Sequence, residues 1–282
     1  MSNATSGHSS GAMTKAQRRA AAQEKAKQLR EAQEKRERRN RFILIGGVGA
    51  VLLVVAVLVW FIFSEGSRSP LDRLEENAKP ANVSDDGGIR FDSQLVAGEI
   101  DSDASELAIY LDFACVHCLD FEMMHGQDIA DLVAADEMTV AYYPVAFIGA
   151  GDSSSWSVRA AQATAVVTDG APDRAEEFLR GLFELHEGNP NPSDAEIAMV
   201  AVDLGVPQEV VDRIGEAPFQ AWVGAATQSA RNDDDVTGTP AVFFEGEQVF
   251  TGPEGDGRSW AEPGSIASLV RGEDGAEETQ DD

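Results

Sequence analysis

Two cysteines, Cys115 and Cys118, are the residues of this chain best suited to chemistry. They are the only cysteines among 282 residues, and they lie three positions apart in the motif Cys115-Val116-His117-Cys118. Two cysteines placed at random would take this spacing in about one chain in a hundred, so the spacing is itself informative. Thiols this close can form a disulfide and be reduced again, which predicts thiol-disulfide exchange.

The segments on either side of the motif predict a different role for each thiol. An apolar run at residues 107–113 indicates a buried strand, and a helical pattern follows the first cysteine to about residue 135. Cys115 would then begin a helix, where unpaired N–H groups and the helix dipole favour a thiolate. We therefore expect Cys115 to be the nucleophile and Cys118, one turn later and more buried, to be the resolving thiol. His117 is expected to lower the Cys115 pKa further, by a hydrogen bond or a charge.

A metal site is an alternative use of the same motif. Two cysteines and His117 are potential ligands, but structural zinc usually takes four protein ligands and no second Cys or His pair follows. We therefore expect no metal and no cofactor, with a copper-carrying module left open. A purely structural disulfide is disfavoured, because so small a loop stabilises little.

Three other polar side chains were considered for the site. Asp112 lies three residues before the first cysteine and could assist proton transfer, but a carboxylate at the end of a strand is expected to face solvent. His125 and His186 have no chemical context in the sequence, and both are expected to be solvated.

The remaining elements predict an α/β fold around this motif. Residues 140–147 indicate a second strand, which would pair in parallel with the first across the intervening helix. A long helical stretch follows, and residues 241–251 then read as a hairpin around Gly246 before a last helix near residues 265–270. The helices expected in the long stretch are residues 155–168, 173–186, 193–204, 208–214 and 219–231.

An uncharged apolar segment at residues 42–63 predicts a single transmembrane helix. Its 22 residues would span roughly 33 Å. Residues 1–41 carry eleven basic and four acidic side chains, so the positive-inside rule places this basic segment in the cytoplasm and the rest of the chain outside the cell membrane. A cleaved signal peptide is the alternative, but the apolar segment is longer than the usual signal and lacks a convincing cleavage site.

The part of the chain after the apolar segment is strongly acidic. The whole chain carries a net charge of −27 and residues 1–41 carry +7, which leaves −34 for the remainder. Such a charge repels phosphate backbones, so nucleic-acid binding is not expected. We assign residues 64–86 to a polar linker, residues 87–272 to an extracytoplasmic domain, and residues 273–282 to a disordered acidic tail.

The order of strand, C-x-x-C, helix, strand, helical block and Thr239-Pro240 before a strand resembles the DsbA-like branch of the thioredoxin superfamily. This resemblance implies a thioredoxin-like fold with an inserted helical domain at about residues 152–234. It also implies that Thr239 and a cis Pro240 lie opposite the cysteines and bind an extended substrate. The sequence departs from the family in having Val-His between the cysteines and Ile109 where many thioredoxins keep a buried acid.

Together with the apolar segment and His117, the resemblance leads us to expect a membrane-anchored, monomeric disulfide oxidase. It would donate the Cys115–Cys118 disulfide to unfolded exported proteins that contain cysteines, and a quinone-linked membrane partner of the DsbB or VKOR type would reoxidise it. A reductase or isomerase on the same fold, a copper metallochaperone, and a peptide-binding domain with an incidental redox pair remain alternatives.

Overall fold

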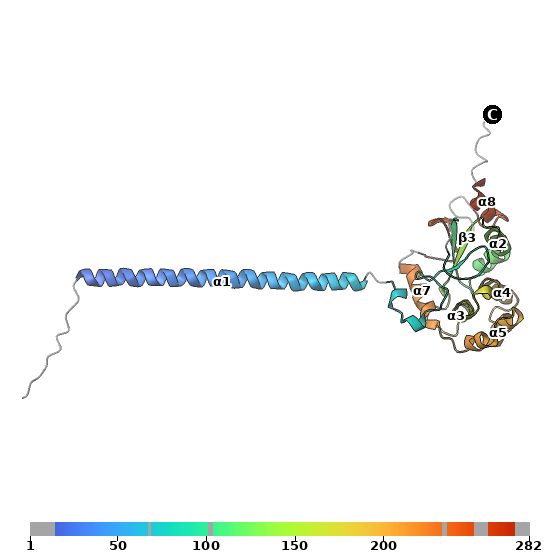
Figure 1. Ribbon diagram of the computed structural model, residues 1–282, viewed down its shortest axis with the longest axis horizontal. Coiled ribbons are helices and arrows are strands. Elements are labelled where there is room, and N and C mark those ends of the chain that lie inside the picture. The colour runs from blue at the N-terminus through green and yellow to red at the C-terminus, as the bar shows by residue number, and fades with distance from the viewer. Residues whose placement is uncertain (1–14, 67–68, 101–103, 233–235, 251–258, 274–282) are drawn as a thin grey trace, which may run out of the picture. The chain divides into compact units, whose positions relative to one another are not determined.

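A computed structural model describes residues 15–66, 69–100, 104–232, 236–250 and 259–273 (Figure 1). The chain forms two compact units, Met1–Ser67 and Arg68–Asp282. The described part of the first unit is one helix, α1 (Lys15–Gly66), which contains the predicted transmembrane segment. Among the described residues this helix alone is long and apolar enough to cross a membrane. The ends of the predicted basic segment and acidic tail, residues 1–14 and 274–282, lie outside the described ranges.

The second unit is built on a five-stranded mixed sheet in the order β1-β3-β2-β4-β5. The central strands β2 and β3 are parallel, and every other neighbouring pair is antiparallel. The strands are β1 (Ile89–Phe91), β2 (Glu106–Leu111), β3 (Thr139–Pro144), β4 (Ala241–Phe244) and β5 (Glu247–Phe250). The predicted strands and hairpin are present, whereas β1 was missed because three residues are too few to show an alternating pattern.

Helices cover this sheet, and most of them lie between β3 and β4 in the sequence. α2 follows β2 directly, α8 ends the unit, and the five helices between them form a block that includes α3, α4 and α5 (Figure 1). The structure thus confirms the α/β fold with a helical insertion. The helices are α2 (Val116–Ala134), α3 (Trp156–Gly170), η3 (Pro172–Arg174), α4 (Ala175–Gly188), α5 (Asp194–Asp203), α6 (Gln208–Ile214), α7 (Gln220–Asn232) and α8 (Ser265–Arg271).

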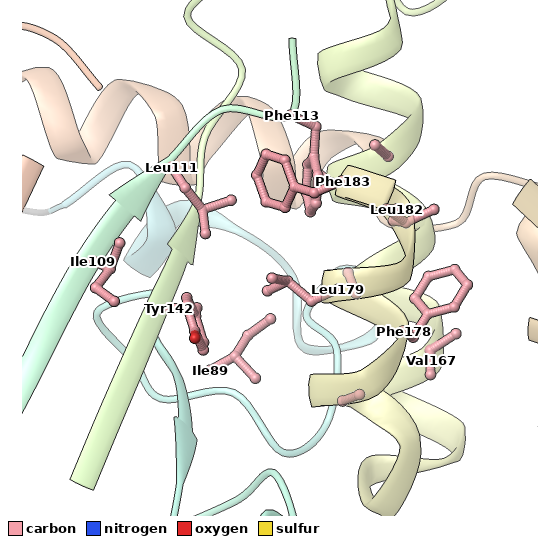
Figure 2. Close-up of a cluster of buried hydrophobic side chains, with 14 of the residues drawn as sticks. Ile89, Ile109, Leu111, Phe113, Tyr142, Val167, Phe178, Leu179, Leu182 and Phe183 are labelled. Atoms are coloured by element: carbon pink, nitrogen blue, oxygen red, sulfur yellow. The ribbon is translucent and has the colours of Figure 1, made fainter. Parts of the chain in front are cut away.

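The alternating pattern of β2 divides the core between the two faces of the sheet. Ile109 and Leu111 point toward Leu179 and Phe183 of α4, in the larger core (Figure 2). The intervening Tyr110 belongs to a smaller cluster on the opposite face. Because β2 is buried from both sides, its end is held firmly where the cysteine motif begins.

The segment before β1 differs from the expected linker. The expectation is a polar tether over residues 64–86, but from Ser69 onward the chain packs within the second unit. Leu71 is 2% exposed within the main core, inside the short helix η1 (Leu71–Arg73), and η2 (Glu76–Ala78) follows. One buried leucine in a polar, proline-containing stretch produces no periodicity, so this packing could not be predicted from the sequence pattern.

Two acidic side chains are buried between α2 and α4 with one arginine. Glu122 and Glu176 each have side chains 4% exposed, and their Oε1 atoms lie 3.9 and 3.5 Å from Arg180 nitrogens. Burial, reinforced by the charge of Glu176, raises the pKa of Glu122 to about 8. One arginine therefore faces two carboxyl groups, and burial raises the pKa of both, so that Glu122 retains its proton at neutral pH.

Replacing Glu122 by glutamine should make the protein less sensitive to alkaline pH. The pKa of Glu122 is about 8 in the folded protein and 4.5 in the unfolded chain. Between these values the folded protein holds a proton that the unfolded chain has lost, so the free energy of unfolding falls as pH rises from about 4.5 to about 8. We therefore expect Glu122→Gln to raise the free energy of unfolding by on the order of 2 kcal/mol at pH 9 and by much less at pH 5. Urea unfolding of the full chain in mild detergent measures this difference. Glu209→Gln, at an exposed position of α6, serves as the control and should show no such pH-dependent gain.

Candidate active site

The cysteine motif lies at the junction between β2 and α2. Cys115 is the N-cap of α2, with an extended backbone, and its N–H donates to the Asp112 carbonyl at 3.0 Å. Cys118 lies in the first turn of the same helix, and both residues are free thiols. The strand, cysteine and helix therefore follow in the order that the sequence predicted.

The two thiols have opposite electrostatic properties. The hydrogen bond from Cys118 is the largest influence on Cys115 and lowers its pKa to about 5, with further help from the backbone N–H groups of Cys118 and His117. Cys118 is 2% exposed, and burial raises its pKa well above the usual value. At neutral pH the arrangement therefore provides a thiolate at Cys115 and a protonated, buried thiol at Cys118.

The Thr239–Pro240 loop lies directly against the nucleophile. The peptide bond between these residues is cis, and Cys115 Sγ lies 3.2 Å from the Thr239 carbonyl oxygen, to which the thiol donates when it is protonated. Residues 124 positions apart in the sequence are thus brought together, as the resemblance implied. The loop therefore forms part of the immediate surroundings of the Cys115 sulfur.

The His117 side chain lies beside Trp260 at the edge of the motif. It is exposed, and its ring centroid lies 6.5 Å from that of Trp260. Its backbone N–H contributes to the low Cys115 pKa. A role of the imidazole in tuning the thiolate stays a prediction.

Trp260 borders the site and was missed in the sequence. A surface groove beside the motif is lined by His117, Leu119, Asp120, Met123, Met124, Glu187, Trp260 and Ala261. His125 holds this tryptophan, because its Nε2 is hydrogen-bonded to the Trp260 carbonyl at 2.5 Å. The expectation that His125 is solvated was wrong, since it is fully buried. Its spacing from Phe121 places both on the buried face of α2, a pattern that could have revealed it.

Asp112 is also buried, contrary to the expectation that it faces solvent. It is 0% exposed, and its carboxylate accepts hydrogen bonds from Ala114, Ile148 and Ser157. The end of β2 is covered by the first turn of α3, which the sequence did not place there. His186 is likewise only partly exposed, and its ring stacks on Trp156 at 5.6 Å.

The comparisons with known proteins agree with this geometry. Residues 92–259 match the family model described as Thioredoxin, whereas no curated protein matches the chain significantly. The MdbA thiol-disulfide oxidoreductase from Actinomyces oris is 26% identical, with 73% of this chain and 99% of that chain covered and a TM-score of 0.58.

Two further solved structures share the fold at lower identity. MdbA from Corynebacterium diphtheriae is 19% identical, with 73% of this chain and 99% of that chain covered and a TM-score of 0.54. Reduced DsbA from Mycobacterium tuberculosis is 21% identical, with 67% of this chain and 93% of that chain covered and a TM-score of 0.53. The fold of this chain, with its sheet and helical insertion, is therefore shared with all three of these solved structures.

Proposed function

This chain belongs to the thioredoxin family and is a thiol-disulfide oxidoreductase of the DsbA and MdbA type, and from this premise we propose that it acts as a disulfide oxidase. The observation that carries the proposal is the contrast between the two thiols. A Cys115 pKa of about 5 stabilises the reduced protein at neutral pH, so the disulfide is the less stable state and is readily donated.

The proposed reaction passes through one mixed disulfide. A substrate thiolate attacks the Sγ of Cys115, and the bond to Cys118 breaks. A second substrate thiolate then attacks the substrate sulfur of the mixed disulfide and releases Cys115 as a stable thiolate. The substrate gains a disulfide, and the enzyme retains the two electrons as a thiolate at Cys115 and a protonated thiol at Cys118.

The proposed setting is the extracytoplasmic side of the cell membrane, where disulfides persist. Helix α1 supports an anchored state, because its apolar part at residues 42–63 is long enough to span a bilayer and follows the basic segment of residues 1–41. The substrates would be unfolded exported proteins, bound beside Thr239 and Pro240 by a monomeric enzyme. A membrane reoxidase of the DsbB or VKOR type would restore the disulfide.

A metallochaperone that uses Cys115, Cys118 and His117 as ligands stays an alternative. Across the described ranges, no group of three His, Cys, Asp or Glu side chains is placed to hold a metal ion. His117, the third ligand considered for copper, lies beside Trp260 and is directed to the groove.

The reduction potential of the Cys115–Cys118 pair tests the oxidase proposal. We expect a value closer to about −120 mV, typical of DsbA, than to about −270 mV, typical of thioredoxin. The full chain is equilibrated in glutathione buffers, and the fraction of disulfide is measured by thiol alkylation and mass spectrometry. A value at or below the thioredoxin level would support a reductase and contradict the oxidase proposal.

A further inference from the structure

The buried carboxylate of Asp112 connects three segments around the cysteine motif. Its Oδ1 accepts from the backbone N–H of Ala114 at 2.9 Å and from the Ser157 hydroxyl. Its Oδ2 accepts from the backbone N–H of Ile148 at 2.8 Å. One side chain therefore ties the loop before Cys115 both to the segment after β3 and to the first turn of α3.

The first turn of α3 holds the same loop at a second point. Trp156 Nε1 donates to the Phe113 carbonyl at 2.8 Å, and the Trp156 ring is stacked against His186 of α4. Trp156 and Ser157 are 5% and 0% exposed, so neither contact competes with water. The helical insertion thus fixes both the side chain of Asp112 and the peptide that follows it.

The backbone N–H of Asp112 points at the resolving sulfur. It donates to Cys118 Sγ at 3.4 Å, and Cys118 itself is almost completely buried. A buried thiolate is costly unless hydrogen-bond donors face it. This N–H is therefore placed to stabilise negative charge on Cys118 at the moment when that sulfur is released.

We propose that Asp112 is a positioning residue for the resolving thiol: its carboxylate, held by Ser157 of the helical insertion, aims its own N–H at Cys118 Sγ. The inference rests on the proposed thiol-disulfide exchange. When a substrate thiolate attacks Cys115 Sγ, a new S–S bond forms and the Cys115–Cys118 bond breaks. The electron pair of the broken bond leaves on Cys118 Sγ, beside the Asp112 N–H, and that thiolate is later protonated by solvent.

The variant Asp112→Asn tests this proposal by the rate at which reduced glutathione opens the disulfide of the full chain. Asparagine has one acceptor oxygen, and its NH₂ would face a backbone N–H donor, so the loop should shift. We expect opening to be about tenfold slower, because a leaving thiolate that has lost a hydrogen bond departs more slowly. The pKa of Cys118, measured by alkylation after Cys115 has been blocked, should rise.

The variant Ser157→Ala separates the effect of the Ser157 hydrogen bond from that of the Asp112 carboxyl group itself. It keeps the carboxyl group and removes one of its donors, so a smaller effect in the same direction is expected. Faster opening and a lower Cys118 pKa in Asp112→Asn would show that the carboxylate acts by its charge, and would overturn the proposal. An unchanged rate of disulfide opening and an unchanged Cys118 pKa in the folded variants would also overturn the proposal. If Asp112→Asn does not fold, the result for Ser157→Ala decides whether the proposal holds. A wild-type disulfide that glutathione cannot open would instead contradict the proposed function.

Discussion

Replacing Cys118 by serine should turn the protein into a trap that retains thiol compounds at Cys115. In the wild type, Cys115 thiolate attacks oxidised glutathione and forms a mixed disulfide, which Cys118 then resolves. Cys118 lies one turn away in the same helix, so this internal step is fast compared with release by an external thiol. Without it, we expect nearly every Cys118→Ser molecule to carry one glutathione, detected by intact mass spectrometry.

The reciprocal variant is the matched control, because it makes the same substitution in the same helical turn. Cys115→Ser lacks the thiolate and retains a thiol that is 2% exposed with a raised pKa. It should form no adduct at neutral pH and lose disulfide exchange by about a thousandfold or more. Adducts on Cys115→Ser and none on Cys118→Ser would reverse the assigned roles.

Much of this site could be predicted from short-range patterns. The apolar run before Cys115 and the helix after it are local features, and together they locate the nucleophile at a helix N-terminus. The association of Cys115 with Thr239–Pro240 is different, since nothing local links residues 124 positions apart. Only the resemblance to a known family connected them.

The residues whose positions differ from the expectation, or were not predicted, are placed by tertiary contacts. Asp112 looks like a strand-end carboxylate until α3 is placed over it, and Ser157, its partner, carries no mark in the sequence. Trp260 follows a polar stretch and reaches the site only because His125 and Phe121 lie on the same face of α2. In each case the sequence lacks the information on which segments pack together: α3 over the end of β2 for Asp112, and the segment of Trp260 on α2.

The stability of the reduced protein should depend on pH through Cys115. Its pKa is about 5 in the folded protein and about 9 without the fold. Between these values the unfolded chain binds a proton that the folded protein does not, so stability rises with pH in this window and is lost as pH falls toward 5. We expect the free energy of unfolding to increase by up to about 1.4 kcal/mol per pH unit relative to Cys115→Ser.

Urea unfolding of reduced wild type and of Cys115→Ser at several pH values between 5 and 9 measures this dependence. Taking the difference between the two proteins removes the opposite slope contributed by Glu122, because both contain it. The same thiolate also determines the redox property, since oxidation removes the charge that stabilises the reduced fold. Oxidised protein should therefore be less stable than reduced protein at pH 7, and the two should converge toward pH 5. If the difference in the free energy of unfolding between oxidised and reduced protein does not change with pH, the Cys115 thiolate is not what makes the disulfide oxidising, whatever the reduction potential of the pair.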